Sequence, residues 1–147
     1  MSDQHINAAG LAIIKKWEGM KLESYLCPAG KWTIGYGHTK NVRPDQKLRD
    51  EAHAEELLKE DCEDAEHGVN RCIDVPLNDN QFSALVSFVF NLGEGALRRG
   101  TIPAKIRNGN YIGAAETMKQ YIKAGGRPLP GLKARREEEA DLFLRPA

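Results

Sequence analysis

The pattern of hydrophobic positions predicts that most of the chain is helical. Leu11, Ile14 and Trp17 recur at the spacing that places them on one helix face. Asn7 is a residue type that caps helix N-termini, and Gly19 is typical of a helix end. We therefore predict a first helix from Asn7 to Trp17 that ends at Gly19 and turns an apolar stripe toward the core.

A short stretch with the alternation of a β-strand follows this helix. From residue 22 to residue 39, glycine and aromatic residues replace helix formers, and residues 31–38 alternate with period two. A turn is expected at residues 27–30, because proline fits its second position and glycine its fourth. The pattern predicts a small β-hairpin lobe over about residues 20–45.

The rest of the chain has the pattern of helices. Asn78 and Gln81 resemble a capping box, and the segment from Phe82 to Phe90 is apolar on nearly all sides, as in a central helix. Further helices are predicted at residues 50–67, 102–108, 111–124 and 132–144. We predict a mostly α member of the α+β class, with residues 1–147 forming one domain.

Composition and charge exclude several classes of protein. A chain of 147 residues with 41% apolar and 29% charged residues can bury a core without disulfide or metal staples. Its longest apolar segment, residues 82–92, is far shorter than the roughly 20 residues that span a bilayer. No membrane insertion and no signal peptide are expected. The net charge of zero argues against nucleic acid as a partner.

The cysteines do not form a metal-binding or disulfide pattern. Cys27, Cys62 and Cys72 are an odd number without CxxC spacing, and the histidines lack paired ligand spacing. We therefore expect neither a metal nor another cofactor. A bridge between Cys62 and Cys72 after export stays open at this point.

The predicted strand at 31–38 carries glycines on one face. Thr33, Gly35 and Gly37 share that face, and the other face carries Trp32, Ile34, Tyr36 and His38. Glycine within a strand often marks the close approach of a ligand or of another backbone. This face is therefore either the floor of a cleft or a surface packed tightly on a helix.

Several motifs resemble those of the phage-type lysozymes, glycoside hydrolase family 24. The matching segments cover nearly the whole chain and comprise residues 17–19, Cys27, 32–38, 80–93 and 131–137. The family uses a Glu, eight residues, an Asp or Cys, five residues and a Thr, which Glu18, Cys27 and Thr33 match in the cysteine form. The resemblance implies a lysozyme-like fold with a cleft between the small β-hairpin lobe and a larger helical lobe. It also implies an endolysin that hydrolyses the β-1,4 bond between N-acetylmuramic acid and N-acetylglucosamine in peptidoglycan.

The residues themselves fit this chemistry. Glycoside cleavage requires an acid that protonates the leaving oxygen and a second group that attacks or activates water. Glu18 suits the first role, because its place at the end of an apolar stripe is expected to raise its pKa. Cys27 would serve as nucleophile or base, and the Thr33 hydroxyl would position the water. With cysteine in place of a carboxylate, retention and inversion both stay open.

Two further pairs have supporting roles. Arg135 and Arg136 lie on a predicted helix with Leu132, Leu142 and Phe143, and the resemblance implies that one of them lies near Glu18, without deciding which. His38 lies opposite Thr33 on the predicted strand, where a histidine usually has one satisfying partner. The candidate partner is Asp61, and the resemblance implies a similar structural pair.

The predicted ligand is a glycan strand of peptidoglycan. The resemblance implies that Phe90 and Asn91 line the cleft, and Gly35 is a further candidate for contact with the substrate. We expect a monomer that accumulates in the host cytoplasm and acts on the wall from the periplasm after a holin opens the membrane.

Two other functions stay open from the sequence. A peptidoglycan amidase or peptidase would use Cys27 and His38, which lie in one hairpin. A non-catalytic wall-binding protein would retain the cleft, and its cysteine in place of aspartate would mark lost activity.

Overall fold

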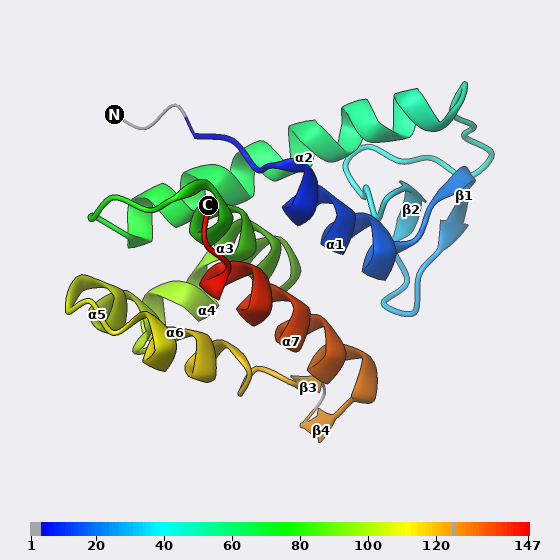
Figure 1. Ribbon diagram of the computed structural model, residues 1–147. Helices are drawn as coiled ribbons and strands as arrows, with labels where there is room; N and C mark the ends of the chain where they lie inside the picture. Colours follow the sequence, from blue (N-terminus) through cyan, green and yellow to red (C-terminus); the bar gives the residue numbers. More distant parts are fainter. Residues whose placement is uncertain (1–3, 125) are drawn as a thin grey trace.

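The protein consists of helices and two small hairpins, as the computed structural model shows for residues 4–124 and 126–147 (Figure 1). The helices are α1 (Ala8–Glu18), α2 (Glu51–Cys72), α3 (Asp79–Leu92), α4 (Glu94–Arg99), α5 (Ile102–Arg107), α6 (Tyr111–Met118) and α7 (Pro130–Leu144). The strands are β1 (Lys21–Leu26), β2 (Trp32–Gly35), β3 (Lys123–Ala124) and β4 (Arg127–Pro128). The predicted mostly helical class with a small hairpin is confirmed.

Helix α1 begins and ends as predicted. The Asn7 side chain accepts a hydrogen bond from the backbone N–H of Gly10 at 3.0 Å and thereby satisfies one free donor of the first turn. Gly19 has a φ of 71°, a left-handed conformation that glycine adopts without steric cost. The helix therefore stops directly after Glu18, whose side chain lies at its end.

Strands β1 and β2 form the predicted antiparallel hairpin, but β2 is shorter than predicted. Gly30 donates to the Cys27 carbonyl at 2.8 Å, which confirms the turn at 27–30. The period-two alternation predicted through residue 38 is wrong beyond Gly35, whose φ of 66° ends the extended conformation. The chain turns back there, and Ile34 and His38 bond each other through two backbone hydrogen bonds of 2.9 Å.

Two predicted helix ends are wrong. Helix α2 runs to Cys72, well past residue 67, and Gly68 inside the helix lets α4 approach closely. A Cβ atom on Gly68 would lie 3.3 Å from the Glu94 Cβ. Helix α6 stops at Met118 instead of continuing to residue 124, and the following segment pairs as β3 and β4.

The position of two cysteines on one helix excludes a disulfide between them. Cys62 and Cys72 both lie in α2, where ten residues correspond to about 15 Å along the axis. A disulfide needs Cα atoms within about 7 Å. The described cysteines are all free thiols.

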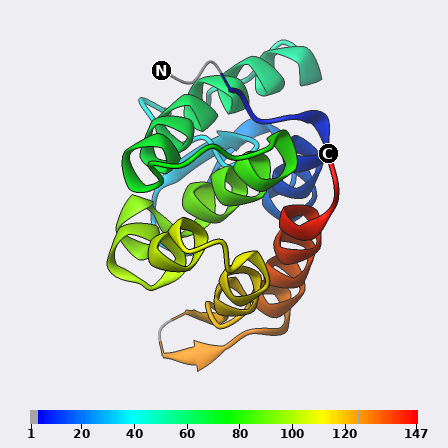
Figure 2. The same ribbon diagram turned by 60° about the vertical axis from the view of Figure 1, so that its left-hand side comes forward.

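Helix α3 lies at the centre of the larger core. Its residues from Phe82 to Val89 are buried, and it packs against α1, α2 and α7 (Figure 2). A second cluster joins the hairpin to α1 and α2 and includes Ile14, Ile34 and Leu58. Helix α2 contributes to both clusters and thus connects the two lobes.

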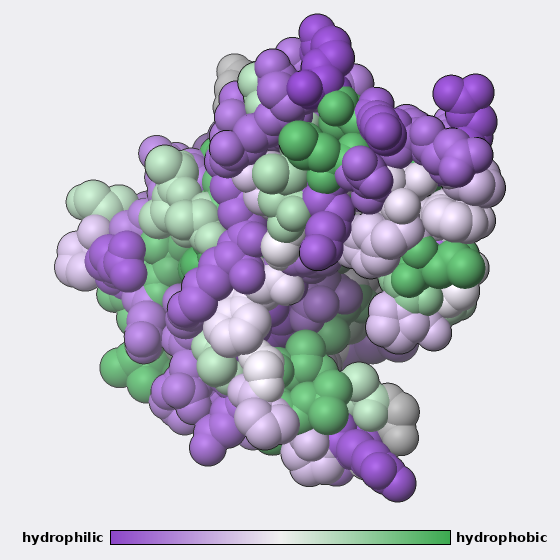
Figure 3. All heavy atoms as spheres, turned by 90° about the vertical axis from the view of Figure 1, so that its right-hand side faces the viewer, coloured by the Kyte–Doolittle hydropathy of each residue, from purple (hydrophilic) through white to green (hydrophobic). Residues whose placement is uncertain are grey.

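The face of the molecule that carries the hairpin lobe is hollowed. Figure 3 shows hydrophilic residues in the hollow and separate apolar patches around it. In the described part of the chain, no helix is both long and apolar enough to cross a membrane.

Candidate active site

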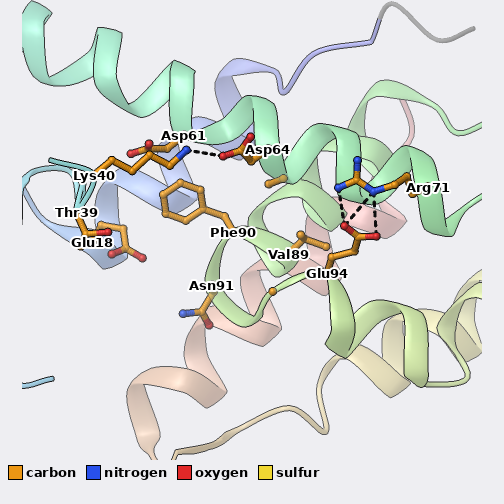
Figure 4. A pocket seen from close by; sticks show the side chains of 13 residues that line it. Glu18, Thr39, Lys40, Asp61, Asp64, Arg71, Val89, Phe90, Asn91 and Glu94 are labelled. Carbon is orange, nitrogen blue, oxygen red and sulfur yellow. Dashed lines mark hydrogen bonds and ion pairs between the residues drawn. The ribbon is translucent and has the colours of Figure 1, made fainter. Parts of the chain in front are cut away.

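A pocket of about 530 Å³ brings together residues from both lobes (Figure 4). It is lined by the end of α1, the loop after β2, the second half of α2 and the junction of α3 with α4. Its lining residues are Glu18, Gly37, Thr39, Lys40, Asp61, Asp64, Ala65, Arg71, Val89, Phe90, Asn91, Gly93 and Glu94. The predicted acid therefore shares a pocket with both predicted cleft residues of α3.

Glu18 is held in this pocket by an arginine of α7. Its side chain is 24% exposed, and its Oε2 accepts a hydrogen bond from Arg135 Nη1 at 3.0 Å. Arg136 instead donates from Nη2 to the Asn91 Oδ1 at 2.6 Å. The structure thus decides the alternative left open by the sequence, since Arg135 contacts Glu18 and Arg136 contacts Asn91.

Gly37, and not Gly35, lies beside the Glu18 carboxyl group. A Cβ atom on Gly37 would lie 2.5 Å from Glu18 Oε1. Gly35 faces the opposite way, because the chain turns after it, and its Cβ position is 3.4 Å from Leu48 and 3.5 Å from Ala54. The predicted contact of Gly35 with the substrate is therefore corrected. Gly35 packs on α2, whereas Gly37 lines the pocket.

Replacing Gly37 with alanine should lower the rate of peptidoglycan cleavage by about 10–100-fold, because the new methyl group displaces the Glu18 carboxyl group. The φ of 71° adds strain that also lowers stability. Gly109→Ala is the matched control, with a φ of 76° and no atom within 4 Å of its Cβ position. Equal activity losses in the two variants would refute a specific effect on Glu18; cleavage rate and Tm are the measurements.

Cys27 and Thr33 form a second group, in the hairpin. Cys27 is half-buried, and a backbone hydrogen bond with Lys31 lowers the pKa of its thiol, helped by Ala29 and the Thr33 hydroxyl. Thr33 is buried, and its hydroxyl donates to the Lys31 carbonyl at 3.0 Å. The single hydroxyl proton of Thr33 can be donated to the Lys31 carbonyl or to the Cys27 sulfur, but not to both at once. Within the described residues, the lining of the Glu18 pocket includes neither side chain.

The expected partners His38 and Asp61 lie within hydrogen-bond distance. His38 Nδ1 is 2.8 Å from Asp61 Oδ2, and the histidine is buried. The turn after β2 brings His38 back to Ile34 and directs it toward α2. The pair therefore ties the hairpin lobe to the helix that connects the lobes.

Phe90 and Asn91 line the pocket at the end of α3. The Asn91 Oδ1 accepts from Arg136, which fixes the orientation of the amide. Its Nδ2 group remains a donor for a ligand. An aromatic ring beside an amide donor is suited to hold an N-acetylated sugar.

Two ion pairs in the pocket were not predicted (Figure 4). Lys40 Nζ lies 2.6 Å from Asp64 Oδ2, and Arg71 Nη2 lies 2.6 Å from Glu94 Oε1. The hydrogen bonds from Arg71 lower the pKa of Glu94 to about 2, and Arg98 adds to this effect. The acidic face of α2 was a usable signal for Asp64, whereas the short helix that carries Glu94 was not predicted.

Comparison with known proteins identifies the family. Residues 15–139 match the family model described as phage lysozyme. The chain belongs to the phage lysozyme family. An endolysin of Acyrthosiphon pisum secondary endosymbiont phage 1 is 43% identical over 143 residues, which cover 95% of this chain and 97% of that protein.

Solved structures agree with this membership of the phage lysozyme family. The muramidase domain of SpmX from Asticaccaulis excentricus has a TM-score of 0.88 at 35% identity and covers 97% of this chain and 99% of its own. The endolysin from Escherichia coli O157:H7 phage FAHEc1 has a TM-score of 0.87 at 36% identity, with 97% and 95% covered. This phage lysozyme is therefore a glycoside hydrolase of the lysozyme type, from a family of enzymes that lyse peptidoglycan.

Proposed function

We propose that this chain is a muramidase that hydrolyses the β-1,4 bond between N-acetylmuramic acid and N-acetylglucosamine in peptidoglycan. The position of Glu18 carries the proposal, because its partly exposed carboxyl group lines a pocket shared by Phe90 and Asn91. A carboxyl group in such a place can reach a glycosidic oxygen of a strand bound beside those residues.

Glu18 acts as the general acid in this proposal. Its proton passes to the glycosidic oxygen as the bond from that oxygen to the anomeric carbon breaks. Arg135, 3.0 Å from Oε2, stabilises the carboxylate that remains. Gly37 leaves the space in which the carboxyl group moves toward the sugar.

Cys27 supplies the second group, with Thr33 beside it. As a nucleophile, the thiolate bonds to the anomeric carbon, and water later displaces it with net retention. As a base, it takes a proton from a water that attacks the same carbon with inversion, and the Thr33 hydroxyl positions that water. The lowered pKa of Cys27 favours the thiolate that both routes require.

The chemistry of the products tests the proposed function. Purified peptidoglycan treated with the protein should gain reducing sugar ends in step with its loss of turbidity, and no new amino groups. New amino groups without reducing ends would instead identify an amidase or peptidase. Binding to the wall without either product would identify a non-catalytic wall-binding protein. The anomeric configuration of the first product, followed by NMR, distinguishes the two roles of Cys27.

How the enzyme reaches the cell wall is predicted from the sequence. The monomeric state, the cytoplasmic location before lysis and the release by a holin stay predictions. The proposed partner is the glycan strand itself.

A further inference from the structure

A buried group of charges lies beneath the pocket on one turn of α7. Arg136 and Glu139 have 0% exposure, and Arg135 is also buried. Burying charges is costly unless they are paired and hydrogen-bonded. These three side chains therefore depend on one another.

Glu139 is the common partner of both arginines. Its Oε2 accepts from Arg135 Nε at 3.2 Å and from the Ser87 hydroxyl of α3 at 2.6 Å. Its Oε1 lies 2.9 Å from Arg136 Nε. The carboxylate thus joins two guanidinium groups to α3.

Each arginine reaches from Glu139 to a different residue of the pocket. Arg135 extends to Glu18 at the end of α1, and Arg136 extends to Asn91 at the end of α3. We propose that Glu139 is a positioning residue of the active site, which sets how Arg135 holds Glu18 and how Arg136 holds Asn91. Glu139 does not itself line the pocket that the described residues form.

Between Arg136 and Glu139, charge contributes more than hydrogen bonding, because the hydrogen bond that Arg136 Nη2 donates to Glu139 Oε2 is long, at 3.4 Å. Arg136 Nε and Glu139 Oε1 attract at 2.9 Å, but their geometry is not that of a hydrogen bond, and Arg136 Nη1 has no hydrogen-bond partner among the described residues. The guanidinium lies 5.3 Å from the centre of the Phe88 ring. Burial raises the pKa of Glu139 and lowers that of Arg136. The charge of each residue opposes the pKa shift that burial causes in the other.

The arrangement predicts opposite effects for two substitutions. The groups that face Glu139 are Arg135 and Arg136 from α7 and Ser87 from α3, with Glu18 beyond Arg135. Glu139→Gln leaves Glu18 as the remaining carboxylate partner of Arg135, so the Glu18 carboxylate is favoured. Arg136→Met leaves the Glu139 charge entirely to Arg135, so the Glu18 carboxylate is less favoured.

The measurement is the pH dependence of turnover on saturating purified peptidoglycan, read as reducing ends. Because the acid must hold its proton, the alkaline limb should move to lower pH in Glu139→Gln and to higher pH in Arg136→Met, each by about half a pH unit or more. Arg136→Met should also raise KM, since Asn91 loses its partner. Glu137→Gln, the same change at an exposed neighbour, should move neither quantity.

If Glu139 had a merely structural role, the two substitutions would lower Tm and leave the alkaline limbs of both variants in place. This result would overturn the inference, and so would limbs that move in the same direction in both variants. The double variant, Glu139→Gln with Arg136→Met, removes one buried charge of each sign and provides the test if a single variant does not fold. The alkaline limb of the double variant should move to lower pH. The inference rests on the proposed role of Glu18. A wild-type protein that produces no reducing ends would refute that role, whereas an active protein with unmoved limbs refutes the role of Glu139 alone.

Discussion

Replacing Glu18 with glutamine should lower the rate of peptidoglycan cleavage by a factor of about 10²–10⁴, the usual contribution of a general acid. Glutamine has the same shape and can still accept a hydrogen bond from Arg135, which lies 3.0 Å from Oε2 in the native protein. It has no acidic proton to give to the leaving oxygen. The fold should persist, because Glu139 still compensates the buried Arg135 charge.

The measurement for this variant is the rate of release of reducing ends, together with Tm and binding to intact peptidoglycan. Glu23→Gln is a matched control, since this carboxyl group lies on β1 with 74% exposure and forms a long ion pair of 3.8 Å with Lys47. It should retain wild-type activity. Cleavage by Glu18→Gln within a few-fold of the wild type would remove Glu18 from the mechanism, and equal losses in both variants would indicate a general charge effect.

Features that depend on neighbouring residues were predictable from the sequence. The turn at 27–30 follows from proline and glycine at fixed positions of one turn type. The capping box at α3 follows in the same way, since Asn78 Oδ1 accepts from the Gln81 N–H at 2.7 Å and Gln81 Oε1 accepts from the Asn78 N–H at 2.9 Å. Both need only residues three apart, so long-range packing does not change them.

Features that depend on where the chain turns back were not predictable in the same way. The alternation at 31–38 predicted that Gly35 and Gly37 share one face of a strand. The left-handed φ of Gly35 instead reverses the chain and separates the two glycines. Gly35 then packs on α2, and Gly37 lies at Glu18. Likewise, the choice of Arg135 as the partner of Glu18 depends on how α7 is rotated against α1 and α3, and neighbouring arginines do not specify that rotation.

The cysteine should be replaceable by a carboxylate but not by a hydroxyl group. Cys27→Asp should retain cleavage, whereas Cys27→Ser should lose activity by about a hundredfold or more, because serine does not ionise near neutral pH.

The pH dependence of cleavage should differ between the wild type and Cys27→Asp. The wild type loses activity as pH falls through the lowered pKa of the thiol, since the thiolate takes up a proton. Cys27→Asp should keep its activity to lower pH, because an aspartate ionises near pH 4.

Alkylation tests the same thiol without a mutation. Burial raises the pKa of Cys62 to about 12 and also raises that of Cys72, so a thiolate-selective reagent should modify Cys27 first. Wild-type activity should fall as one equivalent reacts, and Cys72→Ser should behave in the same way, whereas Cys27→Asp should be insensitive. A fully active Cys27→Ser variant, or full activity after Cys27 is alkylated, would show that the sulfur takes no part in catalysis. The attacking water would then need another base. Thr33 could not take this role, because a neutral hydroxyl group is a weak proton acceptor.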